Sequence, residues 1–341
     1  MLHIDGSEGE GGGQILRTSL ALSMITGTPI RIRNIRAKRS RPGLMRQHLT
    51  SVQAAAQVSG AQVEGAAVGS MEITFTPSAV QPGEYSFAIG TAGSTTLIVQ
   101  TVLPALLCAA GPSRISLEGG THNPAAPPFE FLDRAFLPLV RRMGPRVETT
   151  LERAGFYPAG GGCLRVSVEP VGTLTGFNLL ERGEIRERRA TVVLANLPPH
   201  IGEREAREVA KLTNWEPSRI EIRRVDSAGP GNAIVLELES EALTEVFTAF
   251  GEVGVPAETV ADKVVREMRR YLAAGVPVRE HLADQLLLPL ALAGGGSYRT
   301  LLLSLHAKTQ VDLIPRCLDV RIEVEDGEDR TCLVRVEPYK R

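Results

Sequence analysis

His306, with Lys308 two residues further on, is the side chain best suited to nucleophilic chemistry in this chain. A neutral imidazole can attack phosphorus, and a neighbouring cation disfavours the charged imidazolium. The chain has six histidines but no HExxH pattern, so its sequence does not indicate a zinc site. The alternative is that His306 makes only a structural hydrogen bond, as a lone histidine commonly does.

A basic segment near the N-terminus supplies groups that would bind phosphate. Residues 11–63 include no Asp or Glu and eight cations: Arg17, Arg31, Arg33, Arg36, Lys38, Arg39, Arg41 and Arg46. On a chain with a net charge of −1, this local excess suits a phosphorylated ligand or a polynucleotide backbone. Arg39 and Arg41 fall in a Pro-Gly loop, and loops commonly carry binding sites. The alternative is a solvated basic face without a ligand.

A glycine-rich run, Gly9 to Gly13, precedes the first apolar helix. Free backbone N–H groups at a helix start can hold an anion. The run is neither a Walker loop nor a GxGxxG fingerprint, and a simple tight turn is the alternative. Glu10, the only carboxylate within it, could hold a divalent ion that bridges to phosphate oxygens.

The elements that must position these residues recur along the chain as three copies of one unit. In the first two copies a second glycine follows 33 residues after the first, at Gly27 and Gly60 and at Gly111 and Gly144. Gln100, Pro104 and Gly111 have the same spacing as Gln285, Pro289 and Gly296. We therefore expect three loops at equivalent ends of the units. These loops are residues 36–41, residues 120–123 with His122 as a weaker binding candidate, and residues 305–308.

Each unit is expected to combine two helices with several strands. Helical spacing covers residues 14–26, 44–59 and 129–143, and alternation predicts strands at 71–76, 163–169 and 301–304. The fold class is therefore α/β (α+β), with sheets that carry helices on one face.

The repeat also predicts an insertion. Gly27 and Gly111 are 84 residues apart, whereas Gly111 and Gly296 are 185 apart, an excess of about one small domain. Strands at 190–197 and 234–238 and helices at 203–212 and 260–272 fall inside the excess. We expect an inserted α/β domain at residues 185–276, and a large domain built from residues 1–184 and 277–341.

Composition indicates a soluble, cytoplasmic protein. The chain is 43% hydrophobic and 23% charged, and its four cysteines form no CxxC pair. Residues 1–10 do not form a secretory signal, and the longest apolar run, residues 97–110, is too short to span a membrane. We therefore expect no membrane partner.

His281 to Gln285 precede the third apolar helix. Asp284 and Gln285 could simply stabilise its first turn. The match between Gln285 and Gln100 across the repeat suggests instead that both face one cleft.

Several long strings make the chain similar to RNA 3′-terminal phosphate cyclases along its whole length. The strings are residues 9–17 (GEGGGQILR), 41–49 (RPGLMRQHL), 119–128, 155–162 (GFYPAGGG) and 282–290. The resemblance implies a large domain of repeated units like those of enolpyruvyl transferases, with a smaller inserted α/β domain.

The resemblance also implies a reaction with three steps: ATP adenylates a histidine, AMP passes to a 3′-terminal RNA phosphate, and the 2′-hydroxyl displaces AMP to leave a 2′,3′-cyclic phosphate. The matching positions place the nucleophile on His306 and the metal, Mg2+ or Mn2+, on Glu10. They assign ATP binding to Gln100, His281, Leu282, Ala283, Asp284 and Gln285, and phosphate or RNA binding to Arg17, Arg36, Arg39 and Arg41. The family often has Tyr at the position of His281, and Cys where Leu305 precedes the nucleophile.

Two other functions stay open on this sequence. An enolpyruvyl transferase shares the architecture but needs no nucleophilic histidine. A non-catalytic RNA-binding relative that assists ribosome assembly lacks that histidine, so His306 counts against it. The chain has no KxDG motif, which disfavours a lysine-based ligase.

Overall fold

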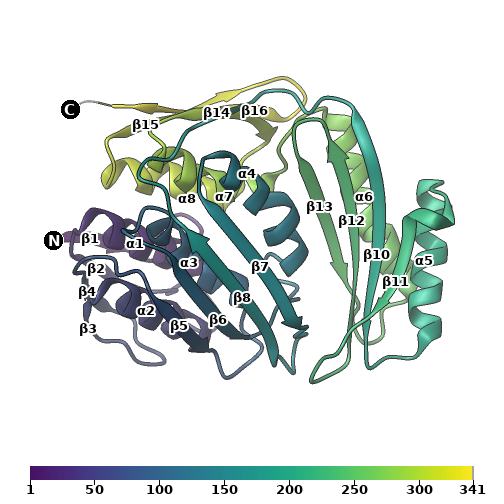
Figure 1. The fold of residues 1–341 in the computed structure, drawn as a ribbon, viewed down its shortest axis with the longest axis horizontal. Coiled ribbons are helices and arrows are strands. Elements are labelled where there is room, and N and C mark those ends of the chain that lie inside the picture. Colours follow the sequence, from purple (N-terminus) through teal and green to yellow (C-terminus); the bar gives the residue numbers. More distant parts are fainter. Residues whose placement is uncertain (340–341) are drawn as a thin grey trace.

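The computed structural model describes residues 1–339, and three of its four sheets share one topology (Figure 1). In each of these three units the chain forms a strand, a helix, a second strand, a second helix and a β-hairpin. The first unit consists of β1 (Leu2–Asp5), α1 (Gly13–Thr26), β2 (Ile30–Arg33), α2 (Arg46–Ser59), β3 (Gln62–Glu64) and β4 (Ile73–Thr76).

The second unit consists of β5 (Glu84–Ala88), α3 (Thr95–Leu106), β6 (Ser113–Gly119), the π-helix η1 (Phe131–Phe136) running into α4 (Leu137–Arg142), β7 (Arg146–Arg153) and β8 (Gly162–Glu169). The third consists of β9 (Asn178–Leu179), α7 (Glu280–Leu292), β14 (Gly296–Leu301), α8 (Leu305–Leu313), the short 3-10 helix η3 (Ile314–Arg316), β15 (Val320–Asp326) and β16 (Thr331–Pro338).

Strand pairing is equivalent in the three sheets, whose orders are β1-β2-β4-β3, β5-β6-β8-β7 and β9-β14-β16-β15. In each, the first strand is parallel to the second, and the two strands of the hairpin extend the sheet antiparallel. The helices of the units pack on one another, with α1 against α2, α3 and α8. The repeat and the α/β fold class predicted from the sequence are therefore confirmed.

A fourth sheet lies between β9 and α7 in the sequence. Its elements are β10 (Ile185–Ala195), α5 (Pro199–Thr213), the 3-10 helix η2 (Pro217–Arg219), β11 (Ile220–Arg224), β12 (Gly231–Ser240), β13 (Thr244–Phe250) and α6 (Ala257–Ala274), in the order β11-β10-β12-β13. We call residues 185–274 the inserted unit. The division into separate domains at residues 185 and 276 stays a prediction.

Both faces of the inserted sheet are buried. Val193 and Val235 join the large apolar core that runs through the three repeated units. Their neighbours Val192, Ile234 and Leu236 point to the other face, where they pack with side chains of α5 and α6. Because both faces are covered, β10 is buried over consecutive residues from Ala190 to Ala195, and it is apolar at every one of these positions except Thr191.

Glycine signals located the C-terminal ends of two helices correctly. α1 and α2 end at Gly27 and Gly60, both in the left-handed conformation with φ of 68° and 57°. The prediction of a strand at 301–304 was wrong, because β14 ends at Leu301 and Ser304 caps α8. Among the described residues, no helix combines the length and apolarity needed to cross a membrane.

Candidate active site

A cleft of about 600 Å3 lies where the three repeated units and the inserted unit meet. The first unit contributes Glu10, Arg17, Arg36, Arg39, Gln47 and His48, and the second contributes Gln100 and residues 124–128. The third contributes His281, Asp284, Gln285 and His306, and the inserted unit contributes Thr248, Phe250, Lys263 and Glu267. Residues of all three repeated units therefore meet around one cavity, although residues 120–123, the loop expected there in the second unit, do not line it.

His306 is the second residue of α8 and does not lie in a loop, as the sequence had suggested. The Ser304 hydroxyl caps this helix by accepting a hydrogen bond from the Ala307 N–H (3.1 Å). The same hydroxyl donates to Oδ1 of Asp284 on α7 (2.7 Å), which ties the two helices together. The imidazole is therefore attached to a capped helix end, where its position is well defined.

The environment of His306 favours the neutral imidazole. Partial burial lowers its pKa, and the guanidinium groups of Arg17 and Arg39 lower it further. Lys308, which we expected to do this, is exposed and does not line the cleft. Its side chain points away because residues two apart on a helix face different directions.

Glu10 connects the glycine-rich run to His306. Its backbone N–H donates to Oγ1 of Thr309 on α8 (2.9 Å), and its carboxylate forms an ion pair with Arg39. Glu10 Oε2 lies 3.8 Å from Nδ1 of His306. Gly12, Gly13 and Gln14 line the cleft at the start of α1. The run thus brings a carboxylate and a helix N-terminus to the histidine.

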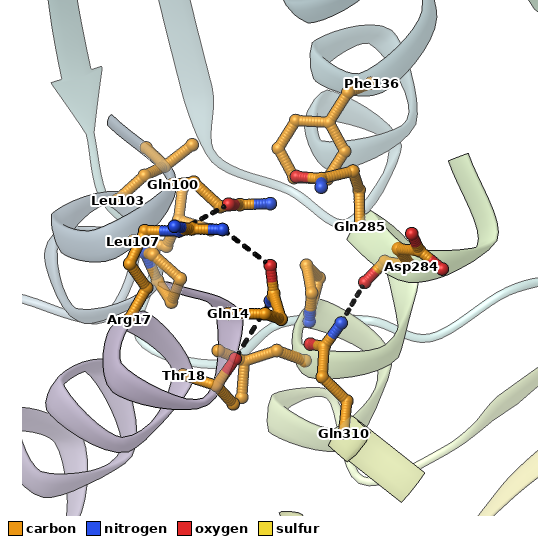
Figure 2. A pocket seen from close by; sticks show the side chains of 13 residues that line it. Gln14, Arg17, Thr18, Gln100, Leu103, Leu107, Phe136, Asp284, Gln285 and Gln310 are labelled. Carbon is orange, nitrogen blue, oxygen red and sulfur yellow. Dashed lines mark hydrogen bonds between the residues drawn. The ribbon is translucent and has the colours of Figure 1, made fainter. Parts of the chain in front are cut away.

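Arg17 is a buried cation that lines the cleft, and Figure 2 shows its side chain beside Gln14 and Gln100 in the small pocket next to it. Its Nε donates to Oε1 of Gln100 (3.2 Å), and an NH2 group donates to Oε1 of Gln14 (2.9 Å). Burial lowers the pKa of its guanidinium to about 10, so it remains charged at neutral pH. Among the described residues no carboxylate forms an ion pair with Arg17. A buried charge without a counter-ion is costly, so this position suits an anionic ligand.

The basic loop after β2 is only partly at the cleft. Arg36 and Arg39 line it, whereas Arg41 is exposed and lies outside its wall. Arg36 has a left-handed φ of 54°, and its guanidinium donates to the Gly43 carbonyl (3.0 Å). His122, in the equivalent loop of the second unit, is also outside this cleft. It is buried, forms an ion pair with Glu130 and stacks on Phe156.

Residues 281–285 lie on α7, and the turn of the helix directs some of their side chains to the cleft and others to the core. His281, Asp284 and Gln285 line the cleft, whereas Leu282 and Ala283 are fully buried in the core. The side chains of the latter two therefore do not reach the cavity, and their role in ATP binding stays a prediction. Burial raises the pKa of Asp284 to about 7.

The cleft offers a metal ion no preformed cage, although Glu10, Glu252, Glu267 and Asp284 all line it. Among the described residues, no group of three or more His, Cys, Asp or Glu side chains is placed to hold a metal ion. Glu10 Oε2, however, is buried and has no hydrogen-bond partner among those residues. Mg2+ is commonly held by one or two carboxylates together with substrate phosphates. Glu10 therefore fits a metal that is shared with a phosphorylated ligand.

Comparison with known proteins gives a consistent result. The family model described as RNA 3′-terminal phosphate cyclase matches residues 8–324. Proteins of that name from Koribacter versatilis and Ectopseudomonas mendocina are 52% and 51% identical to this chain. The alignments cover 96% of the chain and 93% of the first relative, and 98% and 97% for the second. The chain belongs to the RNA 3′-terminal phosphate cyclase family.

Sequence reasoning missed several residues of this family member's cleft. Gln47 and His48 on α2 line it, and burial together with Arg36 and Arg17 lowers the pKa of His48 to about 3. Both lie in the 41–49 string that carried the resemblance, which was the available signal. Lys263 and Glu267 lie on α6 of the inserted unit, where no repeat pattern marked them.

Proposed function

We propose that this protein converts an RNA 3′-terminal phosphate into a 2′,3′-cyclic phosphate in an ATP-dependent reaction in the cytoplasm, with His306 as the covalent nucleophile. Membership in the family supports the overall reaction. One observation carries the residue assignment. Arg17 is buried, forms no ion pair with a carboxylate among the described residues, and lines the same cleft as the partly exposed His306.

In the first step His306 attacks the α-phosphorus of ATP. Because Nδ1 faces Glu10, Nε2 is the nitrogen we assign to the attack. Its lone pair forms the P–N bond while the bond from that phosphorus to the bridging oxygen breaks, and pyrophosphate leaves with the electron pair. Arg17 and Arg39, whose charges already act on the imidazole, would stabilise the negative charge on the phosphate oxygens.

The next two steps use the activated phosphate. An oxygen of the RNA 3′-phosphate attacks the phosphorus of the histidine adduct, and the electron pair of the P–N bond returns to the imidazole. The resulting anhydride has AMP as a good leaving group. The 2′-hydroxyl then attacks the RNA phosphate, loses its proton, and displaces AMP. This last step needs mainly that the hydroxyl and the leaving group be held in line.

Gln100, His281, Asp284 and Gln285 would hold ATP along the α3 and α7 walls, and Arg36 would contact phosphate. Glu10 would hold Mg2+ or Mn2+, because its buried Oε2 is unpartnered among the described residues. When bound there, the metal would neutralise charge on the phosphate oxygens.

The test is His306→Ala incubated with α-labelled ATP and a divalent metal, followed by denaturing electrophoresis. We expect the protein–AMP band to disappear while circular dichroism shows a folded chain. Lys308→Ala is the matched control, since this exposed side chain on the same helix lies outside the cleft, and it should keep the band. The His306→Ala protein should still cyclise RNA supplied already as the 3′-adenylylated anhydride.

Adduct formation by the His306→Ala protein, or mass spectrometry placing AMP on another residue, would contradict the assignment. Wild-type protein that binds 3′-phosphorylated RNA but forms neither adduct nor cyclic phosphate would instead support the non-catalytic relative.

A further inference from the structure

A second cavity of about 740 Å3 continues from the active-site cleft. Pro124, Phe250 and Glu252 line both, so the two spaces share a wall. One side of this second cavity is the loop at residues 156–158, between β7 and β8. The other side belongs to the inserted unit: the start of α5, the start of β12 and the loop at residues 251–256. We call it the Tyr157 groove.

The loop that carries Tyr157 is held tightly from behind. Phe156 is 2% exposed and stacks on His122 at 4.9 Å, and its ring packs so closely on Gly231 that a Cβ there would lie 2.2 Å from it. The Gly160 N–H donates to the Phe156 carbonyl (2.7 Å), which closes the turn. Tyr157 itself is 68% exposed, although Phe156 before it is buried. The loop therefore presents an aromatic ring to solvent from a fixed base.

The lining of the Tyr157 groove is mainly apolar and aromatic, with His200, Glu205, Asn232 and Glu252 among its polar members, and it has little free positive charge. Its members include Pro158, Leu197, Pro230, Phe250 and Val255. Arg204 is the one Arg or Lys among the described residues that line it, and its guanidinium makes two hydrogen bonds to the Glu258 carboxylate (2.8 and 2.7 Å). A polynucleotide would consequently be bound here through its bases rather than through its phosphates.

We propose that the Tyr157 groove binds the bases of the nucleotides that precede the 3′-terminal nucleotide of the RNA, with Tyr157 as their stacking platform. This inference rests on the proposed function. An RNA whose terminal phosphate reacts near His306 must leave the cleft, and the shared wall provides a continuous path. Stacking on aromatic side chains is how proteins bind single strands without sequence preference, because every base has a π-face.

The experiment compares 3′-phosphorylated oligoadenylates of one, two and three nucleotides, at saturating ATP, with wild-type protein and Tyr157→Ala. For the wild type, KM should fall as nucleotides are added. The Tyr157→Ala change should raise KM for the trinucleotide by roughly five- to 150-fold, which corresponds to about 1–3 kcal/mol per stacked base, and leave kcat unchanged. KM for the mononucleotide should stay the same, since that substrate has no preceding base.

Two controls separate stacking from a structural effect. Tyr157→Phe keeps the ring and should behave as wild type, and Tyr339→Ala removes an exposed tyrosine that does not line the groove. A trinucleotide with an abasic residue before its 3′-terminal nucleotide should lose affinity for the wild type but none for Tyr157→Ala. The effect of Tyr157→Ala should also be independent of salt between about 50 and 200 mM, unlike the loss of a phosphate contact.

Binding of unreactive 3′-hydroxyl oligoadenylates, measured by fluorescence anisotropy, distinguishes this inference from the proposed function. Cyclisation with a KM that depends neither on the length of the oligoadenylate nor on Tyr157 would contradict base binding in the groove but would agree with the proposed function. Binding that depends on length and on Tyr157, without any cyclisation, would contradict the function and support the groove. An equal rise in KM for all three substrates would show that Tyr157 acts on the cleft itself, and would overturn the inference.

Discussion

Ser304 is the residue through which we expect the fold to hold His306 in place. Its hydroxyl accepts from the Ala307 N–H at the start of α8 and donates to the buried Asp284 carboxylate. The Ser304→Ala change removes the helix cap, at a cost of about 1 kcal/mol. It also removes the hydroxyl donor of the buried Asp284 carboxylate, which then keeps only the Ala307 backbone N–H among the described residues, at about 1–3 kcal/mol. We therefore expect the free energy of unfolding to fall by about 2–4 kcal/mol.

Ser94→Ala is the matched control for this prediction. Ser94 caps α3, the equivalent of α7 in the second unit, by accepting from the Leu97 N–H (3.3 Å), and its other partner is the Thr96 hydroxyl (2.7 Å). Thr96 keeps a second partner, the Pro127 carbonyl (2.6 Å). The cap and the bond to Thr96 are lost, but the Thr96 hydroxyl still donates to Pro127, so Ser94→Ala should cost about 1 kcal/mol.

The assays are urea unfolding and AMP transfer from labelled ATP. The difference in the free energy of unfolding between wild type and Ser304→Ala should be larger at pH 8 than at pH 6. Asp284 has a pKa of about 7, and its ionised form accepts a stronger hydrogen bond from the Ser304 hydroxyl than its protonated form does. AMP transfer should also slow, since small misplacements of a reacting group can cost about 100-fold. Equal destabilisation by the Ser304 and Ser94 changes at both pH values would refute the role of the Asp284 bond.

Arg39→Ala should weaken RNA binding and make the slope of log affinity against log salt concentration shallower by about one unit or slightly less. Arg41→Ala should leave this slope unchanged, because Arg41 lies outside the cleft. Equal slopes for the two variants in a salt titration would indicate a diffuse basic surface. Glu245 is fully buried, and burial raises its pKa to about 7. Between pH 4.5 and 7, the folded state therefore keeps a proton on Glu245 that the unfolded state releases. The free energy of unfolding should consequently fall as pH rises through this range, by about 3 kcal/mol at most. Glu245→Gln keeps an acceptor for the backbone N–H of Arg279 and should lose this pH dependence. If the free energies of unfolding in urea of wild type and Glu245→Gln differ by the same amount at pH 5 and at pH 8, the titration of Glu245 is not the cause.

Much of the architecture could be predicted from the sequence because it depends on local signals. The glycine spacing and the matched Gln100 and Gln285 indicated three equivalent units, and β10 to α6 fall inside the predicted insertion. The apolar periodicity placed α1 and α6 within a few residues of their observed ends. These features are encoded over short spans, where backbone conformation and side-chain period decide the outcome.

The composition of the candidate site depended on tertiary structure. Sequence proximity suggested Lys308 as the cation beside His306, but the fold supplies Arg17 and Arg39, which lie more than 260 residues earlier in the chain. The same packing places Lys263 of the inserted unit on the cleft wall and sends Leu282 into the core. Local patterns determine which side chains share a face of a helix, whereas the packing of distant elements determines which faces meet, and only the folded chain contains that information.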